Sequence, residues 1–117
     1  KAVGIINTYP DLVAIYGANE VSLQGIAEAV NDLGIKEKIY VSGFDMNTRI
    51  AYFIETDVIK AAMAQRPFNM GYLAVKEALE VQKSKEARQV DVSAVLINKE
   101  NMFLPENQKL IVPFAER

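Results

Sequence analysis

The sequence predicts an α/β fold in which a parallel sheet is flanked by helices. Three short apolar runs, at residues 12–18, 38–43 and 58–64, have the length and composition of buried strands. The segments between them place apolar residues at the three- and four-residue spacing of an amphipathic helix. A strand, a helix and a second parallel strand form a right-handed crossover unit, so the order of these segments indicates the fold class.

The first crossover unit is the clearest. Residues 12–18 (LVAIYGA) form a continuous apolar run, which is typical of a strand buried on both faces, so Tyr16 is expected in the core. Asn19 stands where a helix N-cap is expected, and Gly34 stands where a glycine ends a helix. The helix between them has one apolar face, formed by Leu23, Ile26, Ala27, Val30 and Leu33.

The pattern continues less regularly. Residues 47–54 are expected to form a short helix, and Arg66-Pro67 opens another, with the proline in the first turn. That second helix has an apolar stripe of Phe68, Tyr72, Val75 and Leu79. Residues 91–97 are predicted to form a fourth strand, and the last twenty residues, which contain Pro105 and Pro113, are expected to be mostly irregular.

Composition excludes several kinds of function. The 117 residues include no histidine and no cysteine, which excludes histidine-based triads, thiol nucleophiles and Cys/His metal sites. The formal net charge of −2 provides no basic footprint for nucleic acid. We therefore expect neither an enzyme nor a protein that needs a metal or cofactor. Residues 1–11 resemble the end of a helix running into a turn, so the chain is expected to be part of a longer protein.

Three polar residues each follow an apolar run: Asn19, Asp45 and Gln65. Ligands of open α/β sheets bind outside the carboxyl ends of the strands, so these side chains predict one wall of a pocket for a polar, uncharged molecule. Each residue also has a structural interpretation. Asn19 could cap the next helix, Asp45 could cap the helix at 47–54, and Gln65 could be a solvated loop residue. Similarly, Phe44 is expected in the core, and Arg49 and Arg66 at the surface.

The order of these motifs resembles the carboxyl-terminal half of a type I periplasmic sugar-binding protein, such as the ribose- and galactose-binding proteins. The resemblance covers residues 8–97 and rests on YPDLVAIYGANEVSLQGIAEAVNDLG, then IYVSGFD, then IKAAMAQRPFNMGYLAVKEAL. In that family two α/β lobes close on a sugar. The resemblance implies that Asn19, Asp45 and Gln65 contact sugar hydroxyls and that the chain contains part of one lobe.

The resemblance also implies a division of the chain. Residues 1–65 would belong to the carboxyl-terminal lobe, residues 66–91 would cross the hinge into an amino-terminal lobe, and residues 92–117 would return as a strand and tail. The Phe68–Leu79 stripe would then lack its partner in this chain. An exposed stripe of this kind would favour a homodimer or domain swap. Two positions depart from the family pattern, because Glu20 replaces the usual aspartate and Asp57 stands where relatives often carry glycine.

The resemblance implies a solute receptor for an ABC importer, located in the periplasm or anchored by lipid at the cell surface, with the ABC permease as its partner. The alternative is the effector-binding core of a lactose-repressor-type regulator, which would be cytoplasmic. A small enzyme on the same scaffold is a third class, although none of the usual catalytic motifs is present. The identity of the sugar does not follow from these residues.

Overall fold

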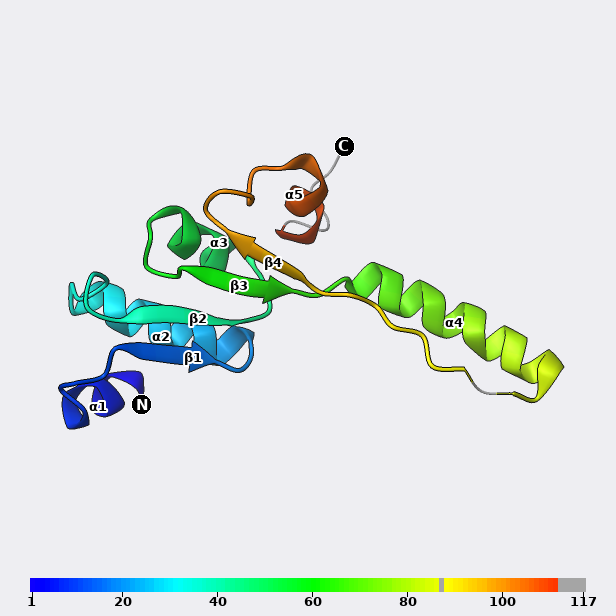
Figure 1. Cartoon of the computed structure of the whole chain (residues 1–117), viewed down its shortest axis with the longest axis horizontal. Helices are drawn as coiled ribbons and strands as arrows, with labels where there is room; N and C mark the ends of the chain where they lie inside the picture. The colour runs from blue at the N-terminus through cyan, green and yellow to red at the C-terminus, as the bar shows by residue number, and fades with distance from the viewer. Residues whose placement is uncertain (87, 112–117) are drawn as a thin grey trace.

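A computed structural model describes residues 1–86 and 88–111 of the chain. In this part, one four-stranded sheet is combined with five helices (Figure 1). The elements in chain order are α1 (Ala2–Thr8), β1 (Ala14–Gly17), α2 (Glu20–Asp32), β2 (Tyr40–Phe44), α3 (Thr48–Glu55), β3 (Ala61–Ala64), α4 (Pro67–Ser84), β4 (Val95–Asn98) and α5 (Pro105–Ile111). The predicted α/β fold class is confirmed.

The sheet has the order β1-β2-β3-β4, and its first three strands are parallel, as the sequence predicts. Gly17 of β1 is paired with Gly43 of β2, and Phe44 of β2 is paired with Met63 of β3. Figure 1 shows these three strands side by side, with their carboxyl ends at the same edge of the sheet. The residues that follow each of these strands therefore lie at this edge.

The fourth strand runs antiparallel to β3, so the sheet is mixed. Helix α4 does not fold back over the sheet, as a crossover helix between parallel strands would. It extends away from the carboxyl end of β3, and residues 88–94 run back alongside it (Figure 1). The chain therefore re-enters the sheet at the end where it left, with Val95 paired to Ala64, and must run in the opposite direction.

The extension of α4 makes the molecule elongated. The chain measures 58 × 34 × 19 Å, and its radius of gyration of 17.6 Å exceeds the value of about 13 Å expected for a compact domain of this length. Within the described part of α4 no residue is buried, whereas α2 and α3 each bury several. No helix in this part of the chain combines the length and apolarity needed to cross a membrane.

The core lies on one face of the sheet, where α2 and α3 pack. Alternate strand residues point into it, including Val41, Ala62 and Ile97, which are fully buried. The predicted apolar face of α2 is largely confirmed, because four of its five members are buried and only Leu33 is exposed. The largest fully buried side chains are Phe53, Leu23, Ile50, Ile54, Ile59 and Ile97.

The opposite face of the sheet is largely uncovered in the described chain. Tyr16, Tyr40 and Leu96 lie on this face, and each exposes more than half of its surface. The prediction that Tyr16 is a core residue is therefore wrong, and Phe44 is only half-buried. The apolar run at 12–18 suggested burial on both faces, but helices pack on one face here.

Both predicted ends of α2 are confirmed. The Asn19 side chain accepts a hydrogen bond from the Ser22 N–H (2.9 Å), and the Ser22 hydroxyl accepts one from the Asn19 N–H (3.1 Å). At the other end, Gly34 adopts a left-handed φ of 65°, and the next N–H, from Ile35, donates to the Val30 carbonyl (3.2 Å). This pairing is typical of a glycine-terminated helix.

Two glycines allow α2 to lie directly on the strands. A Cβ atom at Gly17 would lie 2.6 Å from the backbone nitrogen of Leu23 and closer still to its Cα. A Cβ atom at Gly43 would lie 2.5 Å from the Gly17 carbonyl oxygen and 2.8 Å from Leu23 Cδ1. The first turn of α2 therefore occupies space that side chains at these strand positions would fill.

The carboxyl-terminal part of the chain is more regular than predicted. Residues 105–111 form α5, and Pro105 is its first residue, a position where the missing N–H of proline has little effect. The buried Asn107 donates to the Asn101 carbonyl (2.9 Å), which fixes α5 to the turn after β4. Pro113 lies outside the described residues.

The turn between α3 and β3 contains Asp57, at the position where the resemblance suggests glycine. Asp57 has a left-handed φ of 61°, a conformation that aspartate tolerates better than most residues. Its carboxylate forms an ion pair with Lys99, which follows β4. The hydrogen bond from Lys99 is the main cause that lowers the pKa of Asp57, and the positive charges of Lys99, Lys60 and Lys36 lower it further.

Alanine substitutions at Gly17 and Gly25 are expected to have opposite effects on stability. Gly17→Ala should lower the free energy of unfolding by about 1–3 kcal/mol or more, because the new methyl group would meet the backbone of Leu23. Gly25→Ala, within α2, meets nothing within 4 Å and should raise stability by about 0.5–1 kcal/mol. Urea denaturation of both variants measures the difference. Equal effects of the two substitutions would show that the close contact is not a constraint.

The Asp57–Lys99 pair is expected to make stability depend on pH in the acid range. Because the pKa is lower in the folded state, the pair stabilises the fold above the unfolded pKa of about 3.9, and this contribution disappears as the pH falls through the folded-state pKa. Asp57→Asn keeps a residue that tolerates the turn but removes the charge. Its unfolding free energy should therefore approach that of the parent chain as denaturation experiments move to lower pH. A difference that is constant with pH would contradict the assignment.

Candidate functional site

Asp45 and Gln65 are brought together at the carboxyl ends of two neighbouring strands. Asp45 directly follows β2, Gln65 directly follows β3, and the Gln65 side-chain N–H donates to an oxygen of the Asp45 carboxylate. The Asp45 backbone N–H also donates to the Met63 carbonyl (2.8 Å). Both residues are half-buried. The sequence placed them at strand ends, and the structure shows that they are in direct contact.

The backbone of Asp45 is in the left-handed region, with a φ of 75°. Residues other than glycine rarely adopt this conformation, and such residues are found disproportionately at functional sites. The interpretation of Asp45 as the cap of α3 is wrong, because Asn47 occupies that position and its side chain accepts a hydrogen bond from the Ile50 N–H (2.7 Å). The Asp45 carboxylate instead makes its side-chain contact with Gln65.

Asn19 lies two residues beyond β1, at the same edge of the sheet. Its side-chain oxygen is used in the cap of α2, which confirms the structural interpretation of this residue. The amide nitrogen is not used in the cap, and no partner for it is found among residues 1–86 and 88–111. Asn19 is exposed. Capping and donation to a ligand are therefore compatible, since the two roles use different atoms of one amide.

Asn47 also belongs to this edge, although the sequence did not predict it there. Its amide nitrogen donates to the Glu20 carboxylate (2.8 Å) and to the Gln24 side-chain oxygen (3.3 Å), and so links α3 to the first turns of α2. An asparagine immediately before a helical segment is a recognisable cap signal. No sequence pattern indicates the contacts with Glu20 and Gln24, because they join residues more than twenty positions apart.

The two arginines differ in their surroundings. The Arg49 side chain is half exposed, its Nε lies 3.8 Å from a Glu28 carboxylate oxygen, and its guanidinium lies 4.6 Å from the centre of the Phe53 ring. This is the expected surface role. Arg66 is half-buried directly after Gln65, and its Nε is buried without a hydrogen-bond partner in the described part of the chain.

The strand-end residues offer hydrogen bonds with little net charge. Asp45 is the one charged member of the group Asn19, Asp45 and Gln65. A carboxylate accepts hydrogen bonds, whereas amides both donate and accept. This combination suits a ligand with several hydroxyl groups, each of which can also donate and accept. In the described residues, no group of three or more histidine, cysteine, aspartate or glutamate side chains is arranged to hold a metal ion.

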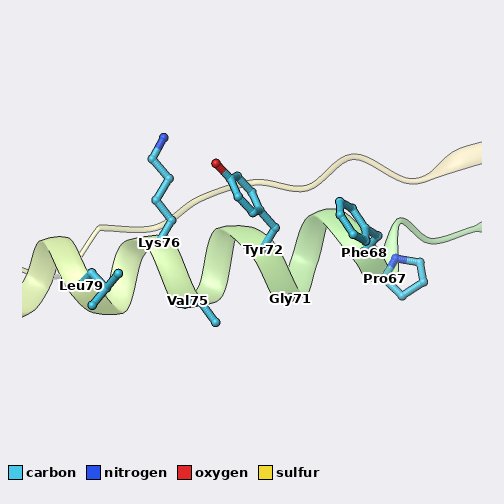
Figure 2. A pocket seen from close by; sticks show the side chains of 7 residues that line it. All are labelled: Pro67, Phe68, Gly71, Tyr72, Val75, Lys76 and Leu79. Carbon is cyan, nitrogen blue, oxygen red and sulfur yellow. The ribbon is translucent and has the colours of Figure 1, made fainter.

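Two surface grooves lie elsewhere, along α4. One is lined by Phe68, Tyr72, Val75 and Leu79 together with Pro67, Gly71 and Lys76, and Figure 2 shows these side chains standing out from the helix. The other lies between α4 and the returning chain, where Arg88 Nε approaches Glu77 Oε2 (3.7 Å). Neither groove includes the three strand-end residues.

Comparison with known families identifies the type of domain. The periplasmic binding protein domain family matches residues 1–86 of the chain. The chain belongs to this family. The family match confirms the resemblance inferred from the strand-end motifs, and it includes all three of the residues Asn19, Asp45 and Gln65.

Two curated relatives are sugar-binding proteins by name. The D-allose-binding periplasmic protein of Escherichia coli (strain K12) is 29% identical over 90 residues, which are 77% of this chain. The ribose import binding protein RbsB of Bacillus subtilis (strain 168) is 30% identical over 92 residues, which are 79% of this chain. The aligned region is 29% of each relative, so the chain spans less than a third of their length.

A solved structure of a solute-binding protein has the same fold. It is a carbohydrate transporter solute-binding protein from Agrobacterium radiobacter in complex with D-arabinose. The TM-score is 0.84 at 31% identity, and the match covers 94% of this chain and 38% of that one. The names of the two relatives and the description of the solved structure each refer to a sugar, and none of the three refers to a transcription regulator.

Proposed function

We propose that this chain supplies one side of a monosaccharide-binding cleft in a solute receptor for an ABC importer. The observation that carries the proposal is the contact between Asp45 and Gln65 at the carboxyl ends of adjacent parallel strands. Similarity to proteins named for allose, ribose and arabinose supports a sugar as the ligand. The regulator alternative has no such support.

The hydrogen-bonding capacity of the site suits a sugar. The Gln65 amide nitrogen is engaged with one Asp45 oxygen, which orients the carboxylate and leaves its other oxygen and the Gln65 carbonyl to accept from hydroxyls. The Asn19 amide nitrogen can donate to a hydroxyl while its oxygen caps α2. A sugar that lacks one of these hydroxyls would leave a polar group unpaired at a cost of about 1–3 kcal/mol, which provides discrimination.

The proposed receptor has two lobes, and most residues of this chain would belong to one of them. Residues 1–65 would form part of the lobe with the strand-end site, residues 66–91 would cross to the second lobe, and residues 92–117 would return. The extension of α4 away from the sheet, directly after Gln65, supports this division (Figure 1). Closure of the lobes would bury the sugar and signal to a membrane permease.

The receptor would act outside the cytoplasm, in the periplasm or anchored by lipid at the cell surface. The two curated relatives support this location, because one is named as periplasmic and the other as an import protein. Binding without chemical transformation is the proposed role of the chain, since its relatives are solute-binding proteins.

Asparagine substitutions at the two left-handed aspartates test the site with a matched control. In the complete two-lobe receptor, Asp45→Asn should weaken monosaccharide binding by about tenfold or more, because bonds to a charged acceptor contribute about 1.5–3 kcal/mol. Asp57→Asn makes the same change in a similar backbone conformation, but in the turn before β3, and should leave affinity unchanged. Calorimetric titration with ribose, allose and arabinose measures both. Equal affinities for Asp45→Asn and the parent protein would remove Asp45 from the site.

The exposed stripe on α4 is expected to make the chain of 117 residues associate with itself. Phe68 and Val75 expose 82% and 64% of their surface, so a second copy could bury them by dimerisation or a domain swap. Sedimentation velocity should show association that increases with concentration, and Phe68→Ser should weaken it. Asn69→Ser, on the same helix but outside both grooves, is the control. A chain that stays monomeric at high concentration would contradict this prediction.

A further inference from the structure

A polar connection joins the beginning of α2 to the beginning of α3. Asn47 makes the contacts with both helices. The Asn47 side-chain oxygen caps α3, and the Asn47 amide nitrogen donates to Glu20 and Gln24 of α2. Glu20 is the first residue of α2, and Gln24 lies one turn later. The contact with Glu20 is a short bond to a charged acceptor (2.8 Å), which is the stronger kind of hydrogen bond.

The two residues that form this connection, Glu20 and Asn47, each lie close in sequence to a residue of the proposed sugar site. Glu20 directly follows Asn19, and Asn47 lies two residues after Asp45. A shift of α2 relative to α3 would therefore change the separation of Asn19 from Asp45. We propose that Asn47 is a positioning residue, which acts through Glu20 to hold these two groups at the spacing that a sugar requires. This inference rests on the proposed function.

The length of the Glu20 side chain allows the connection to form. An aspartate at position 20 would have a side chain that is one methylene group shorter. The glutamate extends far enough from the start of α2 to accept from the Asn47 amide across the gap between the two helices. Its negative charge is also favourable at a helix N-terminus, so the link does not conflict with the stability of α2.

A second contact lies at the opposite end of the same layer and provides the comparison. The Lys36 ammonium, in the segment after α2, donates to the carbonyl of Thr56, the residue that ends α3 (3.0 Å). This contact also ties the α2 region to α3, but it is far along the helices from Asn19 and Asp45. If Asn47 only helped α2 and α3 to pack, loss of the Asn47 contact and loss of the Lys36 contact would have similar effects on sugar affinity.

The test uses the complete receptor and a double-mutant cycle. Asn47→Ser retains a good helix cap but removes the amide donor, and Glu20→Ala removes its acceptor. Each should raise the Kd for the sugar about three- to tenfold, as expected for loss of one hydrogen bond, and the double variant should raise it no further. Lys36→Met, which keeps the apolar stem, should leave the Kd unchanged. Urea denaturation of every variant separates affinity from stability.

The outcomes distinguish this inference from the proposed function. An unchanged Kd for Asn47→Ser, together with the loss of binding in Asp45→Asn, would overturn the positioning role and leave the sugar site intact. Multiplication of the two single effects in the double variant would show that Asn47 does not act through Glu20. An equal loss of affinity in Lys36→Met would show that Asn47 affects binding only through the general packing of α2 against α3. A parent receptor that binds no monosaccharide would overturn both proposals.

Discussion

The close contact between the first turn of α2 and the ends of β1 and β2 fixes where the helix begins at the carboxyl edge of the sheet. Gly17 and Gly43 are paired across the two strands, and a Cβ atom on either would collide with Leu23 or with the neighbouring backbone. Because both positions lack a side chain, the start of α2 rests on the strands, and Leu23 becomes fully buried. Asn19, which caps this turn, is thereby held at the carboxyl edge of the sheet.

The other polar residues at this edge follow from the same arrangement. Parallel pairing of β2 with β3 places Asp45 and Gln65 close enough to form a hydrogen bond. The left-handed backbone of Asp45 reverses the chain between β2 and α3, so that Asn47 can both cap α3 and reach Glu20. The edge therefore carries three separate groups of hydrogen bonds: the Asn19 cap of α2, the pair of Asp45 and Gln65, and the contacts of Asn47 with both helices. They lie at the ends of strands and the beginnings of helices, which are the parts of an α/β sheet where ligands bind.

The sequence predicted features that depend on local chemistry and missed those that depend on how the chain packs. Asn19 as a cap and Gly34 as a helix end are decided by a few neighbouring residues, and both were predicted correctly. The burial of Tyr16 depends on whether a helix covers the second face of the sheet, which the apolar run at 12–18 cannot report. The direction of β4 depends on the path of α4 through space. The Asn47–Glu20 bond depends on tertiary structure alone, because it joins residues 27 positions apart.

In the proposed receptor, Asp45, Gln65 and Asn19 form one side of a sugar cleft. A crystal structure of the complete receptor with its bound monosaccharide would show whether these residues contact the ligand. We expect sugar hydroxyls within about 3 Å of the Asp45 carboxylate and of the side-chain amides of Gln65 and Asn19. We also expect residues 66–91 to lie against a second lobe. A sugar bound away from the carboxyl ends of β1, β2 and β3 would rule out this site.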